Sequence, residues 1–239
     1  MADQRMLEGK TALVTGGSRG IGLAIADRLG QMGAQVSICA RDASRLKTAE
    51  DQLKRKGIRA LGLHADVTLP GDVELLVQET QASLGPIEIL VNNAGTGYFG
   101  PVQAANEAAW DSVLDTNLKG VFLLTRAVAP GMIERRSGHI INIASLAGKN
   151  AFAGGAIYCA SKWGLLGFTY STAEDLRAYG IRVSAICPGS VATEFGPHSG
   201  KDVKKMLTAE DVAHAVEMLV AQSPQSFISE ISMRPTQKP

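Results

Sequence analysis

Short apolar runs alternate along this chain with longer segments in which apolar residues recur every three or four positions. A continuous run of about five apolar residues is typical of a parallel strand buried on both faces, and the longer spacing is typical of an amphipathic helix. Strands are predicted at residues 11–15, 34–40, 58–63, 87–91, 138–144, 181–186 and 226–233. Helices are predicted from the segment after 11–15 to Met32, at 43–56, 71–84, 106–135 and 156–179, and from Thr208 onward, with a short one at 201–206.

This alternation predicts an α/β fold: a Rossmann-like, doubly wound parallel sheet of seven strands with helices on both faces. No linker, repeat or charge run interrupts it, so residues 1–239 are expected to form a single domain. The tail 234–239 is expected to be loose. Right-handed crossovers bring the carboxyl ends of all strands to one edge, where ligands bind.

Composition, net charge and the length of the apolar runs exclude several classes of function. Hydrophobic residues make up 45% of the chain and charged residues 20%, and the net charge is +1, which gives no basic footprint for nucleic acid. No apolar run approaches the roughly 20 residues that span a bilayer, and the polar start lacks the apolar core of a signal peptide. Three separated cysteines indicate reduced thiols in a cytoplasmic protein, and four scattered histidines predict no metal site.

A glycine-rich turn follows the first strand, with the sequence Gly16-Gly17-Ser18-Arg19-Gly20-Ile21-Gly22. Glycines permit a tight turn and a close approach of backbone N–H groups to a pyrophosphate, and the positive end of the following helix favours the same anion. An ordinary strand–helix turn can also contain one or two glycines. Three at spaced positions, with a second strand after the helix, favour dinucleotide binding.

The second strand ends at Ala40-Arg41, where NAD-binding folds carry an acidic residue for the ribose hydroxyl. Arginine can instead pair with a 2′-phosphate, and Arg19 lies in a turn that reaches the same group. The sequence therefore favours NADP(H) as cofactor, although Arg41 also fits a solvated loop charge. Asp42 is expected to cap the helix 43–56.

Other polar residues stand where later strands end. Asp66, followed by Val67, suits either the adenine amino group or the cap of the next helix. Asn93, Ala94 and Gly95 follow the fourth strand, and Ser145 follows the fifth, where its hydroxyl suits a substrate carbonyl or a turn. Asn117 lies inside a predicted apolar helix, an unfavourable place for an amide unless a buried partner satisfies it.

Tyr158 and Lys162 stand four residues apart in a predicted helix and therefore share one face. A free tyrosine has a pKa of about 10, and a nearby cation lowers that pKa. A pKa of about 7 requires roughly 4 kcal/mol of differential stabilisation, more than one lysine readily supplies. A second positive charge, such as an oxidised nicotinamide ring, would help. By itself the pair also fits a surface tyrosine beside a solvated lysine.

Over nearly its whole length the chain resembles the short-chain dehydrogenase/reductase family. The resemblance rests on the segment 15–22, Asn92-Asn93-Ala94-Gly95, Asn117, Ser145, Tyr158 with Lys162, and Pro188-Gly189 with Thr193. It implies that Tyr158 is the general acid–base, Ser145 holds the carbonyl oxygen, Lys162 lowers the Tyr158 pKa and binds the nicotinamide ribose, and Asn117 holds a water of a proton relay.

The same resemblance implies the residues that bind NADP(H). The phosphates of the adenosine half fall to Gly16, Ser18, Arg19, Ile21 and Gly22, and the 2′-phosphate to Arg41. The remaining cofactor contacts fall to Asp66, Val67, Asn93, Ala94, Gly95, Tyr158, Lys162, Pro188, Gly189, Val191 and Thr193.

The reaction implied is reversible hydride transfer between the nicotinamide and a carbonyl or secondary alcohol. A 3-oxoacyl-carrier-protein reductase is the alternative substrate assignment. Those enzymes usually carry glutamine where this chain has Gly155 and end in a glycine-rich segment, whereas Ser232–Thr236 resembles reductases of hydroxy acids and small carbonyls. The resemblance implies that residues 1–239 are one dinucleotide-binding and catalytic domain. The segment between Thr193 and Thr208 is short for the family, which implies a short substrate lid at about 194–207 and an open site. The lid lysines Lys201, Lys204 and Lys205 suit an anionic substrate or a solvated face, and Tyr98, Phe99 and Phe152 are candidates for the pocket wall.

Two other functions fit the same fold. A dinucleotide-binding regulator without turnover has no need of Asn117, Ser145, Tyr158 and Lys162 together, and an epimerase needs a larger C-terminal region. The resemblance also implies a homotetramer, or a homodimer, built through the helices 106–135 and 156–179 and the last strand. The small-molecule substrate and its stereochemistry are not specified by these residues.

Overall fold

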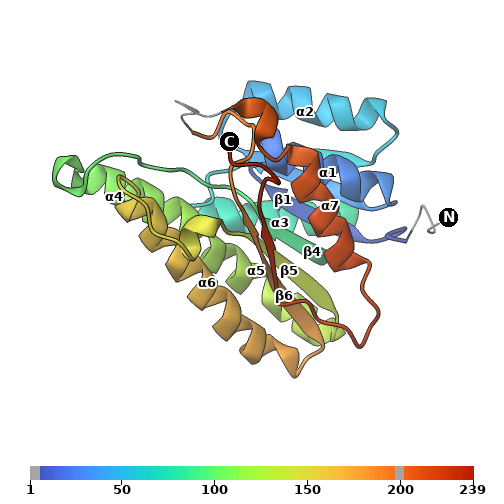
Figure 1. The fold of residues 1–239 in the computed structure, drawn as a ribbon. Helices are drawn as coiled ribbons and strands as arrows, with labels where there is room; N and C mark the ends of the chain where they lie inside the picture. Colours follow the sequence, from blue (N-terminus) through green and yellow to red (C-terminus); the bar gives the residue numbers. More distant parts are fainter. Residues whose placement is uncertain (1–5, 197–201) are drawn as a thin grey trace.

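The computed structural model describes residues 6–196 and 202–239. Seven parallel strands form one sheet in the order β3-β2-β1-β4-β5-β6-β7, and helices cover both of its faces (Figure 1). The strands are β1 (Thr11–Thr15), β2 (Gln35–Ala40), β3 (Ala60–His64), β4 (Ile87–Asn92), β5 (Gly138–Ile143), β6 (Ile181–Pro188) and β7 (Glu230–Met233). The predicted doubly wound, seven-stranded parallel fold is therefore confirmed.

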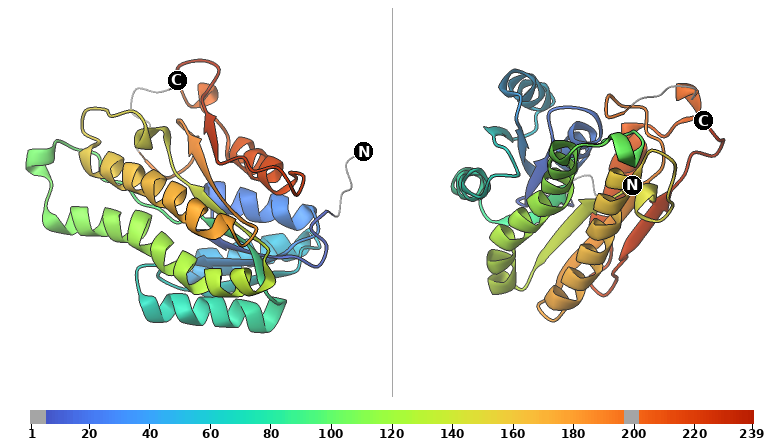
Figure 2. Two further views of the ribbon diagram at one scale, coloured as in Figure 1. Left: turned by 90° about the horizontal axis from the view of Figure 1, so that it is seen from below. Right: turned by 90° about the vertical axis from the view of Figure 1, so that its left-hand side faces the viewer.

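Two layers of helices enclose the sheet, as the side views show (Figure 2). One layer contains α1 (Gly20–Gln31), α2 (Ala43–Arg55) and α7 (Ala209–Val220), in which α1 packs on both of the others. The other contains α3 (Pro70–Leu84), α4 (Glu107–Leu114), α5 (Gly120–Arg135) and α6 (Ala156–Arg177), in which α3 packs on α5 and α4 on α6. This arrangement leaves the ends of the strands free to form a site.

The continuous apolar runs reflect burial on both faces of the sheet. In β1, Ala12 and Val14 join the core cluster under α1, α2 and α7, whereas Leu13 joins the cluster under α3, α5 and α6. All three side chains are fully buried. A strand packed on both faces has no solvent-facing positions, which is why the sequence of β1 does not alternate between apolar and polar residues.

The strand order reverses beside β1. This strand pairs in parallel with β2 on one side and with β4 on the other, so the connections that leave β1 and β4 run to opposite faces of the sheet. Their separation opens a crevice at the carboxyl edge, where doubly wound folds bind ligands.

The long helix predicted at 106–135 is interrupted. Between α4 and α5 lies a π-helical segment, Asp115–Lys119, whose wider turn contains Asn117. One extra residue per turn shifts the helix face, so that Asn117 is buried against the segment after β4 instead of continuing the apolar stripe. Hydrophobic periodicity did not reveal this insertion.

Several predicted boundaries also change. The last strand covers Glu230–Met233 and not 226–233, and the third begins at Ala60. The short helix predicted at 201–206 is a 3₁₀ turn, Val203–Lys205, and residue 201 lies outside the described residues. Within the tail expected to be loose, Arg234, Pro235 and Lys238 line the large cavity described below. Capping is confirmed at Asp42, which accepts from the Arg45 backbone N–H. At the start of α7, Thr208 forms a capping box with Asp211.

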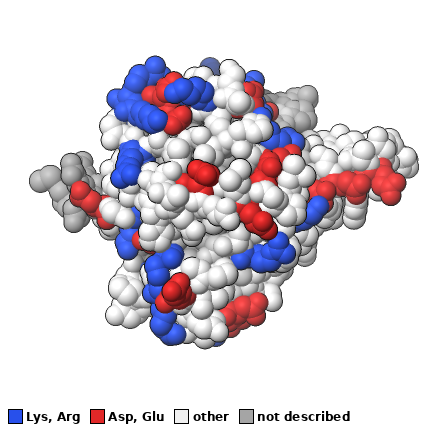
Figure 3. Space-filling model, turned by 180° about the vertical axis from the view of Figure 1, so that it is seen from behind, with Lys and Arg blue, Asp and Glu red and all other residues white. Residues whose placement is uncertain are grey.

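The surface carries mixed charge. On the face seen from behind, basic and acidic side chains are interspersed and no large patch of one sign is visible (Figure 3). On α2, Lys47 and Lys54 pair with Asp51 and Glu50 at 2.5 and 2.6 Å. Among the described helices, none is both long and apolar enough to cross a bilayer.

Candidate active site

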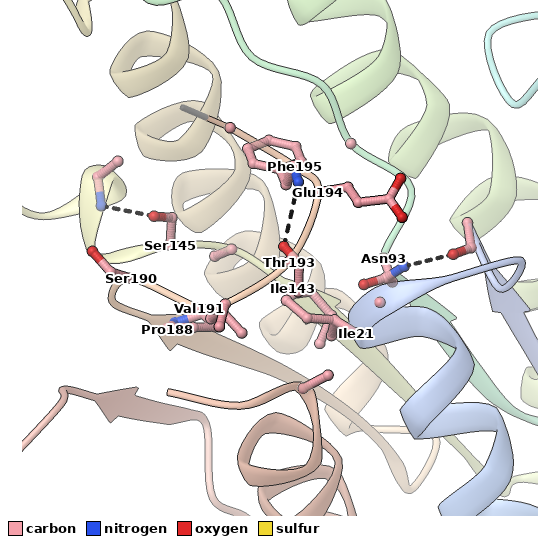
Figure 4. A pocket seen from close by; sticks show the side chains of 18 of the residues that line it. Ile21, Asn93, Ile143, Ser145, Pro188, Ser190, Val191, Thr193, Glu194 and Phe195 are labelled. Carbon is pink, nitrogen blue, oxygen red and sulfur yellow. Dashed lines mark hydrogen bonds between the residues drawn. The ribbon is translucent and has the colours of Figure 1, made fainter. Parts of the chain in front are cut away.

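A cavity of about 1900 Å³ opens at the carboxyl edge of the sheet. The turn between β1 and α1 and the segments that follow β2, β3, β4, β5 and β6 all contribute to its wall, together with α6. Ile21, Asn93, Ser145, Pro188 and Thr193, which lie far apart in the sequence, converge here (Figure 4). The predicted convergence of strand ends therefore produces one continuous site.

The glycine turn is closed by hydrogen bonds from β4. The Asn93 side-chain amide donates to the carbonyl oxygens of Thr15 and Gly16 at 2.9 and 3.2 Å. The Thr15 hydroxyl accepts the backbone N–H groups of Asn93 and Ala94, both at 3.0 Å. Asn93 thus positions the turn, a role that the sequence analysis did not assign to it.

Two glycines make this turn possible. Gly16 has φ +63°, in the left-handed region that favours glycine, and a Cβ there would lie 3.0 Å from the Ala94 Cα. A Cβ on Gly22 would lie only 2.3 Å from the Gly16 carbonyl oxygen and 2.5 Å from Asn93 Nδ2. Gly22 is buried at the start of α1 and packs directly against the turn. The backbone therefore approaches closely enough to form a shallow cradle for an anionic group.

Three arginines gather beside the turn and the end of β2. Arg41 Nη1 lies 3.9 Å from Asp66 Oδ2, and its side chain is 70% exposed. Arg19 and Arg45 both pair with Glu194, a residue of the segment after β6. Asp66 Oδ1 accepts from the Thr68 backbone N–H at 2.9 Å in a local turn, and its second oxygen faces Arg41. The helix α3 begins after Leu69 without a side-chain cap, so the predicted alternative that Asp66 caps this helix is wrong.

Tyr158 and Lys162 lie one turn apart on α6, as predicted, and both are buried. Lys162 Nζ donates to the carbonyl oxygen of Ile143 at 2.9 Å and lies 5.9 Å from the centroid of the Tyr158 ring. Burial lowers the pKa of Lys162 to about 8. An ammonium group at this position therefore loses its proton more readily than a solvated lysine.

Ser145 lies at the end of β5 and faces Tyr158. Burial raises the pKa of Tyr158 above its ordinary value, and a side-chain hydrogen bond with Ser145 acts in the opposite direction. The Ser145 hydroxyl also accepts the Ala147 backbone N–H at 3.0 Å, which fixes its position. Lys162 is not among the groups that shift the pKa of Tyr158 here. The lowering of the Tyr158 pKa by Lys162 therefore stays a prediction.

Asn117 reaches the site from the π-helical segment. Its side-chain oxygen accepts the Thr96 N–H at 2.8 Å, and its Nδ2 donates to the Thr96 carbonyl at 2.8 Å and to the Ser161 hydroxyl at 3.0 Å. The amide holds the segment after β4 against α6. Asn117 does not line the cavity, and its place in a proton relay stays a prediction.

The remaining predicted residues fall on the cavity wall with few exceptions. Those that line it are Ser18, Ile21, Val67, Ala94, Gly95, Pro188, Gly189, Val191 and Thr193. Gly22 lies beneath the wall. Lys204 and Lys205 are absent from the lining, where Val203 is the member of that short turn that contributes, and Lys201 lies outside the described residues.

Aromatic rings surround the Tyr158 side chain. The ring centroids of Phe99 and Phe195 lie 5.4 and 5.8 Å from that of Tyr158, and Phe152 lies 6.4 Å from Phe99. Three of the six phenylalanines of the chain therefore meet at this point, although all three are exposed. Phe99 and Phe152 were predicted in the wall. Tyr98 does not line the cavity.

Arg45, Glu194 and Phe195 are among the wall residues to which the sequence analysis assigned no role, although the last two lie within the predicted lid. Arg45 was not singled out in the sequence, although it lies in the first turn of α2, close to the end of β2. Glu194 and Phe195 follow Thr193 directly, and their adjacency to a predicted cofactor residue is the signal that could have found them. Figure 4 places Thr193, Glu194 and Phe195 on one loop, with the Glu194 and Phe195 side chains diverging.

The sequence model of the family described as short chain dehydrogenase matches residues 10–204. That range covers the glycine turn, Asn117, Ser145, Tyr158 and Lys162. The chain belongs to the short-chain dehydrogenase family.

Relatives of this short-chain dehydrogenase agree with that assignment. A protein of Streptomyces coelicolor, provisionally named a ketoacyl reductase, is 43% identical over 188 residues, which are 78% of this chain and 72% of the relative. A 3-oxoacyl-acyl-carrier-protein reductase of Staphylococcus epidermidis is 34% identical and covers 89% of this chain and 91% of its own length.

Solved structures match the short-chain dehydrogenase over almost its whole length. A metagenomic short-chain oxidoreductase in complex with NADP has a TM-score of 0.86 at 43% identity and covers 97% of this chain and 100% of its own. A variant of actinorhodin polyketide ketoreductase with NADPH has a TM-score of 0.87 at 34% identity and covers 93% and 95%. The chain is an oxidoreductase of this family.

Proposed function

We propose that the protein is an NADP(H)-dependent oxidoreductase that interconverts carbonyls and secondary alcohols. The observation that carries the proposal is the meeting of Tyr158, Ser145 and Lys162 with the glycine turn and its arginines in one cavity. The two solved relatives contain NADP and NADPH, which supports the same cofactor here.

The residues of the site fit a phosphorylated dinucleotide. Gly16 and Gly22 leave a cradle that a Cβ would fill, and a pyrophosphate needs such a close backbone approach at the start of a helix. Arg19, Arg41 and Arg45 supply positive charge at the end of β2, where an acidic residue would mark NAD. Asn93, Ala94 and Gly95 border the middle of the cavity, and Pro188, Gly189, Val191 and Thr193 border its far end.

When bound, the dihydronicotinamide would supply a hydride equivalent to the carbonyl carbon. Tyr158 gives its hydroxyl proton to the carbonyl oxygen, and Ser145 donates a hydrogen bond to the same oxygen. Lys162 is held by the Ile143 carbonyl one turn from Tyr158, so its charge favours the phenolate that remains. In the oxidative direction Tyr158 accepts the proton of the alcohol. We propose that the chain acts as one domain with a short lid at about 194–207, of which residues 197–201 lie outside the described residues.

The substrate class follows from the wall around Tyr158. Phe99, Phe152 and Phe195 present exposed apolar rings to the cavity, a surface that an apolar group beside the reacting carbonyl would cover. Lys204 and Lys205 lie off the wall and therefore support no anionic subsite. A 3-oxoacyl-carrier-protein substrate is the second candidate, and the names of the two curated relatives favour it.

The test is oxidation of NADPH, and in parallel NADH, by purified protein with aromatic ketones, small keto acids and 3-oxoacyl thioesters. Tyr158→Phe removes the acid–base hydroxyl and is expected to lower turnover about 10²- to 10⁴-fold. Tyr170→Phe is the matched control, because Tyr170 lies on the same helix with its hydroxyl on Glu230 at 2.5 Å. Equal turnover by both variants would contradict the proposed role of Tyr158.

A homotetramer, or a homodimer, is proposed as the assembled form. Trp110 on α4, Phe122 on α5 and Trp163 on α6 are large, exposed apolar side chains on the helices expected to form the interfaces. Tyr170 and Lys149 both bind Glu230 and so attach β7 to α6 and the segment after β5. Sedimentation at micromolar concentration is expected to give a tetramer or dimer mass, and a monomer would refute the assembly.

A further inference from the structure

An ion-pair bridge crosses the cavity from the segment after β6 to the arginines beside β1 and β2. Glu194 Oε2 accepts from Arg45 Nη1 at 3.0 Å, and the same oxygen accepts from Arg19 Nη1. Arg19 lies 175 positions from Glu194 in the chain, and Arg45 lies 149. One carboxylate oxygen thus occupies the donors of two guanidinium groups at once.

Together with Arg41, these two guanidinium groups supply the positive charge that a 2′-phosphate would need. They lie in the glycine turn and in the first turn of α2, next to the end of β2, where doubly wound folds place the adenosine ribose. An arginine near this point accommodates a 2′-phosphate through charge-assisted hydrogen bonds. The Glu194 carboxylate therefore occupies guanidinium donors that the 2′-phosphate of the proposed cofactor would use.

A bound phosphate and Glu194 would compete. A phosphate monoester carries a charge near −2 at neutral pH and three acceptor oxygens, whereas the carboxylate carries a charge of −1. Both anions on the same two guanidinium groups would repel each other at close range. Arg45 keeps a second partner when Glu194 leaves, because its Nε lies 3.4 Å from Asp42 Oδ2. The Glu194 side chain is 66% exposed, so it can swing into solvent without breaking the core.

We propose that Glu194 is a specificity-determining residue that occupies Arg19 and Arg45 until the 2′-phosphate of NADP(H) displaces it. The inference rests on the proposed NADP(H) dependence. Glu194 then lowers the affinity for the phosphorylated cofactor and affects NADH much less, since NADH has no 2′-phosphate to compete for the arginines. The arrangement also links cofactor binding to the segment that carries Phe195, because displacement frees Glu194 from both arginines.

The test measures cofactor binding without a carbonyl substrate. NADPH and NADH are titrated into the protein by fluorescence or calorimetry for the unsubstituted chain and for Glu194→Gln, which keeps the shape of the side chain and removes its charge. The dissociation constant for NADPH is expected to fall about three- to tenfold at low salt, the range of two exposed ion pairs, with a smaller change for NADH. High salt is expected to reduce the difference, because the groups are exposed.

Two further variants complete the test. Glu174→Gln is the matched control, because Glu174 is also an exposed carboxylate paired with an arginine, Arg177, at 2.8 Å; its affinities are expected to stay unchanged. Arg45→Gln is expected to weaken NADPH binding and to spare NADH. Thermal unfolding of each variant reports its folding.

Three results would overturn the inference. Equal loss of NADPH and NADH affinity in Glu194→Gln would mean that the ion pairs of Glu194 help to retain either cofactor. No change in either affinity would make it a surface ion pair without a role in selection. Absence of NADPH binding to the unsubstituted chain would refute the proposed cofactor and this inference together, whereas binding without turnover would leave the inference intact and count against the proposed reaction alone.

Discussion

The two sides of the cavity are built on different principles. We call β1, β2 and β3, the turns that follow them and Asn93 the cofactor side, and the other residues of the segments after β4, β5 and β6 that surround Tyr158 the substrate side. On the cofactor side, Asn93 and Thr15 lock the glycine turn with four hydrogen bonds. On the substrate side, exposed phenylalanine rings stand around one buried tyrosine. The cofactor side therefore depends on backbone geometry, and the substrate side depends on side-chain identity.

This difference predicts which positions of the site tolerate substitution. A turn with a Cβ-to-backbone clearance of 2.3 Å at Gly22 admits no side chain. A half-exposed ring such as Phe195 can be exchanged, and the exchange alters only the surface that it presents. Binding of the dinucleotide by the glycine turn should therefore tolerate single substitutions less well than binding of the substrate by the phenylalanine rings.

The largest effect expected on cofactor binding is that of Gly22→Ala. Its methyl group would displace the Gly16 carbonyl and the Asn93 amide, and so disturb the N–H groups of the turn. The NADPH dissociation constant is expected to rise about 10- to 100-fold, the cost of one or two charge-assisted hydrogen bonds. The free energy of unfolding is expected to fall by about 1–3 kcal/mol. Calorimetric titration and thermal unfolding measure the two quantities.

Gly71→Ala is the control for that substitution, because Gly71 lies in α3 and a Cβ there would meet nothing within 4 Å. It should leave NADPH affinity unchanged and stability equal or slightly higher. If Gly22→Ala bound NADPH as tightly as Gly71→Ala, the cofactor side would not depend on the glycine turn.

An intermediate effect is expected from Phe195→Ala on the substrate side. Loss of the ring removes apolar surface next to Tyr158, and KM for an aromatic ketone is expected to rise about five- to tenfold, as for partial burial of one phenylalanine. NADPH affinity is expected to change little. Steady-state kinetics and cofactor titration on the same preparation separate the two.

Tyr179→Ala provides the comparison, because Tyr179 is an exposed aromatic beyond the end of α6 and does not line the cavity. A parallel loss of NADPH and ketone affinity in Phe195→Ala would break the distinction between the two sides.

The smallest effect is that of Glu194→Gln, which sharpens the comparison because Glu194 belongs to the substrate side by sequence and touches the arginines of the cofactor side. Tighter NADPH binding in this variant would show that the two sides communicate through one exposed carboxylate. The expected change is modest because both ion pairs are exposed to solvent.

Most of the sheet could be predicted from the sequence because β1, β4, β5 and β6 are buried on both faces, and such strands appear as continuous apolar runs. The edge strand β7 was overextended, because Phe227 packs against a core cluster and Ile228 is exposed, and neither residue is in the register that pairs β7 with β6. The length of β7 is determined by which of its residues pair with β6, and the local sequence of β7 does not specify this pairing.

The site was predictable where a motif fixes the backbone, as in the glycine turn and at Tyr158 and Lys162 on one helix face. It was not predictable where contacts join distant segments. The π-helical segment around Asn117 changes the helix phase by one residue, and the sequence of the segment carries no periodic signal for it. The bridge from Glu194 to Arg19 and Arg45 depends on side chains more than 100 positions apart. Local patterns give no information at that separation.

The central claim is that Tyr158 supplies the proton for reduction of a carbonyl by NADPH. The most direct measurement is single-turnover oxidation of enzyme-bound NADPH with an aromatic ketone in the unsubstituted protein and in Tyr158→Phe, with NADPH affinity measured for both. The account predicts nearly equal affinities and a rate about 10²- to 10⁴-fold lower in Tyr158→Phe. Oxidation at an undiminished rate in that variant, with NADPH still bound, would contradict it.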